Sequence, residues 1–210
     1  MLQSVKDAIN SFGIYSPFMH RELRSFSWGN KETCRQIFRE IFTFVDQTIA
    51  EFEFIPEYEE IINWMTDTKG KGLLLMGSCG RGKSIIINGL VPILMKMKDR
   101  TVHPIHAQNF YFAPLFSTGN WACPSCLEYL LRTGCPIIDE LGVEGLKNDY
   151  GEKTEGFNLI INNAEVTCKP VFVSTNLNDA QIINRYGERT LDRLGHLCRI
   201  VTFSGPSLRK

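Results

Sequence analysis

The stretch MGSCGRGKS, residues 76–84, places three glycines, a lysine and a serine between two apolar runs. The run Leu73-Leu74-Leu75 before it indicates a short buried strand, and Ile85-Ile86-Ile87 after it opens an apolar segment that we expect to be helical. Glycine adopts backbone angles that are closed to other residues, so successive N–H groups can turn inward around an anion. The following helix directs its unpaired N–H groups and its positive dipole end at the same point. The stretch therefore predicts a phosphate-binding loop.

The loop also satisfies the pattern G-x-x-x-x-G-K-[ST] through Gly77, Gly82, Lys83 and Ser84. In this pattern the lysine reaches the outer phosphates of a nucleotide, and the hydroxyl can ligate Mg²⁺. We therefore predict ATP and Mg²⁺ as cofactors; the alternative is a glycine-rich turn before a core helix. The residues expected to line the nucleotide are Gly77, Ser78, Cys79, Gly80, Arg81, Gly82, Lys83, Ser84 and Ile85.

Composition suits one compact domain with a small appendage, because 43% of the 210 residues are hydrophobic and 22% are charged. Lys+Arg and Asp+Glu balance at 23 each, so net charge indicates neither a nucleic-acid nor a membrane partner, although a local basic patch would suffice for the former. The N-terminus lacks a signal-peptide pattern and no apolar run reaches membrane-spanning length. We expect a cytoplasmic protein without a membrane partner.

Seven scattered cysteines favour reduced thiols over a disulfide framework. Cys123 and Cys126 have zinc-ligand spacing, but a structural zinc site needs two more ligands. The nearest candidates are His103 and His106, which would point to opposite faces of a strand. A plain loop is the favoured interpretation; a zinc site and a redox dithiol are the alternatives. Cys79 in the phosphate loop is a candidate for oxidation.

Apolar periodicity predicts helices over residues 32–52 and 57–65, and a helix after the phosphate loop that Gly89 and Pro92 kink or split. Strands are predicted at residues 72–76, 101–107, 136–139, 171–175 and 199–203. Strands that alternate with helices indicate a mostly parallel sheet covered on both faces, in three αβα layers.

Two acids end the third predicted strand. Asp139, at the carboxyl end of a buried strand, can hold Mg²⁺ through its water shell, and Glu140 can polarise an attacking water. Asn176 ends the next strand and would lie near the γ-phosphate; the alternative is a turn residue with its own backbone hydrogen bond.

Arg189 and Arg193 lie four residues apart in a short predicted helix. Two guanidinium groups on one face repel each other unless an anion binds between them. An arginine that reaches the γ-phosphate of a neighbouring subunit would stabilise the charge of the transition state. The alternative is pairing within the helix, of Arg189 with Asp192 and of Arg193 with Glu188.

Together these motifs resemble those of the AAA+ ATPases of the bacterial helicase-loader group, DnaC/DnaI-like, and much of the set is shared with IstB-like transposition ATPases. The resemblance runs from about residue 55 to the end, and its most specific part is Gly187-Glu-Arg-x-x-Asp-Arg193. It implies an AAA+ type P-loop NTPase fold without a full helical lid. It also implies that Asp139 and Glu140 are the Walker B pair, that Asn176 is sensor 1, and that Arg193, with Arg189 beside it, is the arginine finger.

The resemblance divides the chain into a helical extension of residues 1–54 and an ATPase domain of residues 55–210. It implies an oligomeric ATPase that loads a replicative helicase onto single-stranded DNA, with the extension gripping the helicase. A transposition ATPase and a nucleotide-gated adaptor with negligible turnover remain alternatives. A nucleotide kinase fits less well, because the arginines and Asp139-Glu140 suit attack by water.

Candidate DNA contacts are Lys147 and Tyr150, since in the loaders the similarly placed loop touches single-stranded DNA. A lysine can meet a phosphate and a tyrosine face can stack on a base, whereas Glu144 and Asp149 oppose a phosphate. Phe110, Tyr111 and Phe112 are three aromatic residues that can add stacking, with core packing as the alternative. A mixed basic and aromatic set can serve DNA or a partner protein, with a solvated surface segment as the alternative: Phe18, His20, Arg21, Arg24, Phe26, Trp28 and Lys31.

Overall fold

The structure is a computed structural model that describes residues 25–47, 52–116, 123–145, 147–149 and 152–208, with the backbone alone for 147–149 and 152–154. Its helices are α2 (Lys31–Val45), α3 (Pro56–Thr66), α4 (Lys83–Ile85), the π-helix η2 (Ile86–Leu90), α5 (Val91–Lys96), the 3₁₀ turn η3 (Ala107–Asn109), α6 (Cys126–Arg132), α7 (Gly156–Thr167), α8 (Asp179–Tyr186) and α9 (Glu188–Leu197). Its strands are β1 (Gly72–Gly77), β2 (Ile105–His106), β3 (Ile137–Leu141), β4 (Lys147–Asp149), β5 (Glu152–Thr154), β6 (Phe172–Thr175) and β7 (Cys198–Phe203).

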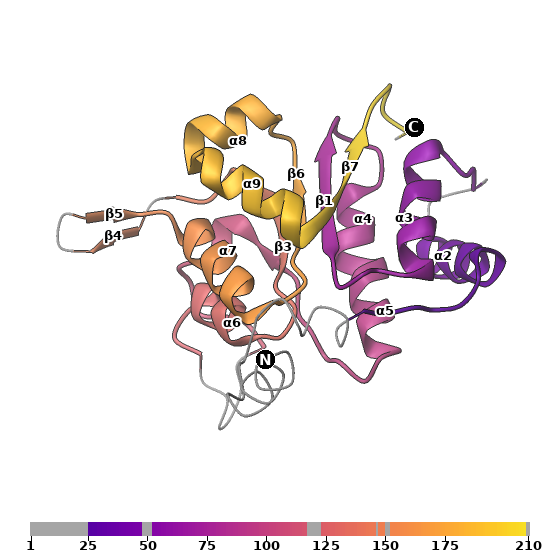
Figure 1. Cartoon of the computed structure of the whole chain (residues 1–210), viewed down its shortest axis with the longest axis horizontal. Helices are drawn as coiled ribbons and strands as arrows, with labels where there is room; N and C mark the ends of the chain where they lie inside the picture. The colour runs from indigo at the N-terminus through magenta and orange to yellow at the C-terminus, as the bar shows by residue number, and fades with distance from the viewer. Residues whose placement is uncertain (1–24, 48–51, 117–122, 146, 150–151, 209–210) are drawn as a thin grey trace, which may run out of the picture.

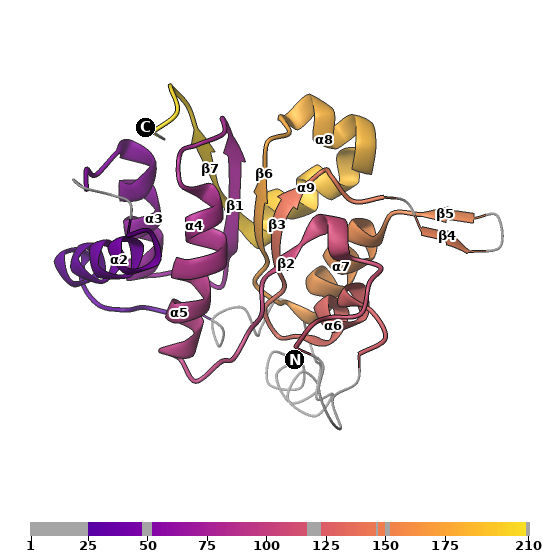
Figure 2. The ribbon, with the colours of Figure 1, turned by 180° about the vertical axis from the view of Figure 1, so that it is seen from behind.

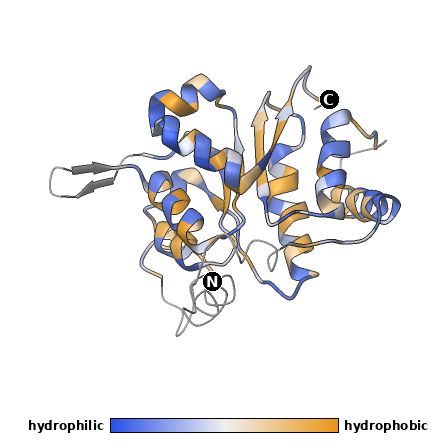
Figure 3. Cartoon of the chain, viewed as in Figure 1, coloured by the Kyte–Doolittle hydropathy of each residue, from blue (hydrophilic) through white to orange (hydrophobic). Residues whose placement is uncertain are grey.

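Five strands form one sheet in the order β2-β3-β6-β1-β7, and every neighbouring pair is parallel (Figures 1 and 2). Successive side chains of β1 point to opposite faces, so Leu73 and Leu75 enter one core and Leu74 and Met76 enter the other. The first core packs α2, α3, η2 and α5 on the sheet, and the second packs α6, α7, α8 and α9. Hydrophobic residues follow the central strands (Figure 3). The predicted three-layer α/β architecture is confirmed.

The helix after the phosphate loop is interrupted where the sequence predicts it. Residues 86–90 form a π-helix between α4 and α5. Pro92 has no N–H to donate to the carbonyl four residues back, which favours a widened turn. Gly89 allows the widened turn to approach α2, because a Cβ there would lie 2.6 Å from Val45 Cγ2.

Helix α2 packs on the same core as α3. Asn30 begins the helix by accepting a hydrogen bond from the Thr33 N–H at 2.9 Å, and the helix ends at Val45 rather than continuing to residue 52. The Phe38 and Phe42 rings lie 5.1 and 5.0 Å from the ring of Tyr58 in α3. The described part of the predicted extension is thus packed against its own chain. The division at residues 54 and 55 stays a prediction.

The sequence did not predict the second sheet, an antiparallel hairpin of β4 and β5. The hairpin leads from β3 to α7 and projects away from the layers (Figure 1). The second predicted strand is also shorter than expected, since β2 covers two residues of the predicted 101–107. None of the described helices combines the length and hydrophobicity needed to cross a bilayer.

Candidate active site

The phosphate loop joins the carboxyl end of β1 to α4. Gly77, Gly80 and Gly82 all have positive φ angles, of 106°, 75° and 88°. At Gly77 a Cβ would lie 2.2 Å from the Phe203 carbonyl oxygen, so both the backbone angle and the close approach of β7 require glycine. The sequence-predicted loop is therefore wrapped tightly against the last strand of the sheet.

Lys83, the first residue of α4, turns its ammonium group back into the loop. Its Nζ donates to the carbonyl oxygens of Gly77 at 2.8 Å and Ser78 at 2.7 Å, and the residue is only 7% exposed. The ammonium group brings a positive charge to the buried side of the loop, so an anion in the loop would be stabilised there. This arrangement fits a phosphate group.

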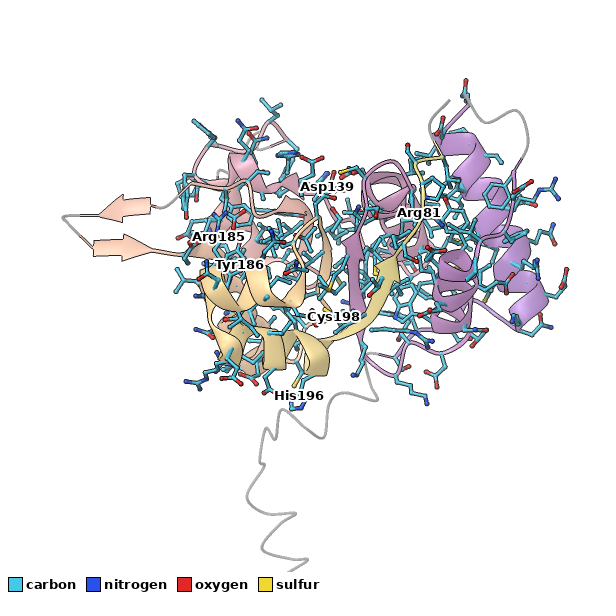
Figure 4. All side chains as sticks on the ribbon, turned by 90° about the horizontal axis from the view of Figure 1, so that it is seen from above. Arg81, Asp139, Arg185, Tyr186, His196 and Cys198 are labelled. Carbon is cyan, nitrogen blue, oxygen red and sulfur yellow. The ribbon has the colours of Figure 1, made fainter. Side chains whose placement is uncertain are left out.

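Ser84 and Asp139 meet at the carboxyl edge of the sheet, although they lie on different elements. Ser84 Oγ donates to Asp139 Oδ1 at 3.2 Å, and Asn88 Nδ2 donates to Asp139 Oδ2 at 2.6 Å. Ser174 on β6 also donates to Asp139 Oδ1. Hydroxyl and carboxylate oxygens are the donors Mg²⁺ prefers, and this ion commonly keeps several waters. The pair fits the predicted ion, and Asp139 is buried at the centre of the molecule (Figure 4).

Glu140, the next residue, has the left-handed φ of +56°, which is uncommon for a residue with a side chain. Its N–H donates to Ser174 Oγ at 3.0 Å, and its side chain turns toward β2. Glu140 Oε2 lies 3.1 Å from His106 Nε2, and both side chains are partly exposed. The carboxylate that would polarise water is therefore held by a histidine of the neighbouring strand.

Arg81 of the loop points into a buried ion pair instead of toward a nucleotide. Arg81 Nη2 lies 3.0 Å from Glu57 Oε1 of α3, and the two side chains are 8% and 7% exposed. Glu57 Oε1 also accepts the Ser204 N–H at 3.1 Å, and Arg81 Nη1 donates to the Pro206 carbonyl at 3.0 Å. Only the backbone of Arg81 remains for a phosphate, so its expected nucleotide contact is limited to the N–H.

The segment after β7 lies on the phosphate loop. The Leu208 N–H donates to the Gly80 carbonyl at 2.9 Å, and a Cβ on Gly80 would lie 2.1 Å from Ser207 Oγ. Residues 204–208 therefore link the loop to the end of the sheet, near α3 (Figure 1).

The remaining predicted catalytic residues lie on β6 and α9. Asn176 is exposed directly after β6, on the same sheet edge as Asp139. Arg193 pairs with α7: its Nε lies 2.5 Å from Glu165 Oε2 and its guanidinium donates to Asn162 Oδ1. The alternative, pairing within the helix of Arg189 with Asp192 and of Arg193 with Glu188, is not found among the described residues. Arg189 is exposed and makes no ion pair with the described residues.

Three residues around Asp139 and Glu140 were not among the predicted residues of this site: Asn88, Ser174 and His106. Asn88 follows Ser84 by one helical turn, a spacing that places both on one face. Ser174 and His106 sit on the strands that flank β3 on either side. These two residues can be placed beside Asp139 and Glu140 only when the order of the strands in the sheet is known, and the sequence does not give that order.

Of the candidate DNA contacts, the structure describes only the backbone of Lys147, in β4, and Tyr150 lies outside the described residues. Phe110 is fully buried, as the core alternative predicts, and Tyr111 Oη accepts the Gly156 N–H at 3.3 Å. Phe112 is 64% exposed.

The basic and aromatic segment is described from residue 25 onward, so Phe18, His20, Arg21 and Arg24 lie outside the described residues. Its remaining members are engaged in packing or pairing. The Trp28 indole is buried and donates to the Leu94 carbonyl at 3.1 Å, the Arg100 guanidinium lies 5.3 Å from the Phe26 ring, and Lys31 pairs with Glu59.

The two candidate zinc histidines have other partners. His103 stacks on Phe116, with ring centroids 4.1 Å apart, and His106 contacts Glu140. Cys126 is buried, which raises the pKa of its thiol. Within the described ranges no group of three His, Cys, Asp or Glu side chains could hold a metal ion. The interpretation of Cys123 and Cys126 as a plain loop stays a prediction.

Comparison with known proteins adds a fold relationship. No protein-family model matches the sequence, and no curated protein matches it. The chain is similar to the crystal structure of DnaI, at 18% identity and a TM-score of 0.50, over 81% of this chain and 94% of that one. It is also similar to a putative primosome component from Streptococcus pyogenes serotype M3, at 18% identity and a TM-score of 0.49, over 94% and 93%. The chain therefore shares the α/β fold of DnaI, with a five-stranded parallel sheet between helices.

Proposed function

We propose that the protein is a Mg²⁺-dependent ATPase of the helicase-loader kind, which acts in DNA replication by placing a replicative helicase on single-stranded DNA. The observation that carries the proposal is the 3.2 Å contact between Ser84 Oγ and Asp139 Oδ1 beside a lysine-bearing phosphate loop. These groups come from separate elements, and together they provide the ligands that Mg²⁺-nucleotide requires.

Each residue then has a role. The loop N–H groups and Lys83 bind the outer phosphates, and Ser84 and Asp139 hold the ion, which neutralises phosphate charge when bound. Glu140 orients the attacking water once its carboxylate leaves His106. Asn176, on the same edge, is available to the γ-phosphate and the water. Most of the catalytic effect would come from positioning and charge.

The helicase partner is supported by the resemblance to the loader group and by the exposed apolar end of α2. Phe44 is 70% exposed and Val45 38% exposed, whereas the opposite side of this helix is buried. An exposed phenylalanine on a packed helix suits a protein contact. Co-purification with a replicative helicase tests this part, and its loss in Phe44→Ser is the expected result.

The ATPase itself is tested with two substitutions. Lys83→Ala should abolish ATP binding in calorimetry, because it removes the cation from the loop. Lys69→Ala is the matched control, since this exposed lysine lies at the other end of β1. Glu140→Gln should keep ATP binding and stop hydrolysis, with Glu128→Gln on α6 as its control. Unchanged affinity in Lys83→Ala would refute the nucleotide site.

A nucleotide-gated adaptor with negligible turnover is the second candidate, and two contacts favour it. Glu140 is held by His106, and Arg193 is held by α7, so neither is poised for hydrolysis within one chain. An oligomer that released either group would activate the site, and specific activity would then rise with protein concentration.

If one subunit supplies its arginine to the nucleotide of its neighbour, mixing Arg193→Ala or Arg189→Ala with Lys83→Ala should partly restore ATP hydrolysis. A mixed assembly then contains sites with both an intact loop and an intact arginine. Turnover that stays negligible at every concentration, with normal ATP binding, would favour the adaptor.

A further inference from the structure

Strand β3 has one residue more than its neighbour β6 at the position of the two acids (Figure 2). Asp139 and Glu140 both stand opposite Ser174, between two regular pairs of the ladder. These regular pairs are Ile138 with Val173 and Leu141 with Thr175. Such an extra residue is a β-bulge, which is rare between parallel strands and which often re-aims a side chain beside an active site.

The packing of β3 agrees with this count. Side chains alternate along a regular strand, so Ile138 and Leu141, three positions apart, would face opposite sides of the sheet. Both lie in the second core instead. Without the extra residue, Glu140 would point into this apolar core, where a carboxylate is costly. The bulge therefore keeps the Glu140 carboxylate out of the core and at the sheet edge, where it is partly exposed beside His106.

The hydroxyl of Ser174 satisfies the polar groups of the bulge. Its oxygen accepts the Glu140 N–H at 3.0 Å, at a point where a bulge disrupts the regular ladder. Its hydrogen is donated to Asp139 Oδ1. Ser174 is 1% exposed, and a buried hydroxyl needs such partners. One hydroxyl thus bonds the backbone of one acid and the side chain of the other.

The two acids leave the bulge in different directions. Asp139 faces the helix after the phosphate loop, where Ser84 and Asn88 donate to it. Glu140 has the left-handed φ of +56° and turns toward β2. An acid that holds an ion and an acid that orients water need separate, fixed directions, since a displacement of about 1 Å can cost about a hundredfold in rate.

We propose that Ser174 is a positioning residue for ATP hydrolysis, which fixes the directions of Asp139 and Glu140 at the bulge. The proposal rests on the proposed function and deepens it, because it names the group on a neighbouring strand that separates the tasks of the two acids. Ser174 acts through these acids rather than on the nucleotide.

Hydrogen exchange in the ligand-free protein tests the contact itself. In Ser174→Ala the Glu140 amide loses its acceptor and should exchange at least about tenfold faster, whereas the amides of β7 should stay within about twofold of the wild type. Ser174→Thr keeps a hydroxyl and should restore most of the protection. If Ser174→Ala does not fold, Ser174→Cys replaces it, because a thiol is only a weak donor and acceptor.

Thr68→Val is the matched control. Thr68 is 3% exposed and its hydroxyl also accepts a backbone N–H, that of Phe26 at 2.8 Å. It precedes β1, at the opposite end of this strand from the phosphate loop. The control therefore removes the same kind of buried hydrogen bond far from the acids, and it should leave the exchange of the Glu140 amide unchanged.

Steady-state ATP hydrolysis then tests the positioning role. In Ser174→Ala we expect kcat to fall at least about tenfold and KM for ATP to stay within about threefold, because the phosphate loop is intact. Ser174→Thr should recover most of kcat, and Thr68→Val should keep the wild-type value.

Unchanged exchange at Glu140, or an unchanged kcat in folded Ser174→Ala, would overturn the role of Ser174 and leave the ATPase standing. A wild-type protein that hydrolyses no ATP would overturn the ATPase and the role of Ser174 in it together.

Discussion

The buried pair of Arg81 and Glu57 predicts that the phosphate loop contributes strongly to stability. At 3.0 Å the Coulomb attraction is about 5 kcal/mol for an effective dielectric constant of about 20. Much of this attraction is offset by the cost of burying both charges. In Arg81→Ala the Glu57 carboxylate is still buried, but it has lost the attraction of the guanidinium group. The Pro206 carbonyl also loses its hydrogen-bond donor. Loss of one partner of a buried pair costs about 3–5 kcal/mol, a large share of a typical unfolding free energy.

The assay is urea unfolding at pH 7, followed by circular dichroism. With a slope of about 2 kcal/mol per molar urea, Arg81→Ala should lower the midpoint by about 1.5–2.5 M. The control is Arg132→Ala, because Arg132 and Glu128 form an ion pair whose side chains are 62% and 42% exposed. Such a pair is worth at most about 0.5 kcal/mol, a shift of about 0.2 M.

A double-mutant cycle isolates the interaction. The double variant Arg81→Met/Glu57→Leu should lose less stability than the two single variants lose together. It leaves no uncompensated charge in the interior, whereas each single variant does. A midpoint for Arg81→Ala that moves no further than the control would refute the reasoning, because it would mean that water reaches the pair.

Two further predictions concern the site, and a third concerns a buried thiol of β7. His106→Gln weakens the contact that holds Glu140, so basal ATP hydrolysis should rise several-fold, measured as phosphate release; an unchanged rate would show that the contact does not restrain Glu140. Cys79 is exposed in the phosphate loop, so maleimide labelling at pH 8 should modify it and Mg²⁺-ATP should slow the reaction, with Cys79→Ser as the control. Burial raises the pKa of the Cys198 thiol to about 12, so this thiol stays protonated below about pH 10 and should remain unlabelled in the same experiment.

The phosphate loop could be predicted because its function lies in a continuous stretch whose backbone needs are visible as glycines. Asp139 could be paired with Ser84 because strand ends of a parallel sheet meet at one edge. Sheet order was not visible, so the histidine beside Glu140 was considered only as a zinc ligand. The partner of Arg193 was missed for a similar reason: α7 is distant in sequence and its packing against α9 depends on the whole second core.

The hairpin shows a second limit of sequence reasoning. Residues 147–154 are mostly polar and charged, with low strand propensity, so periodicity indicates a loop. The hairpin is held at its base by Arg185, which contacts Gly142, Glu144 and Glu155 from a helix later in the chain. Similarly, α2 was expected to belong to an extension, because aromatic residues on a helix suit a partner protein as well as the chain's own core.

The backbone of Glu140 implies a stability–function trade-off at the centre of the site. A left-handed φ costs about 1–2 kcal/mol for a residue with a side chain, and asparagine or glycine adopts it more readily. Replacing Glu140 by asparagine should therefore recover part of this free energy while it removes the carboxylate. Under the proposed function, a variant that needs only to bind ATP would gain stability by this single exchange.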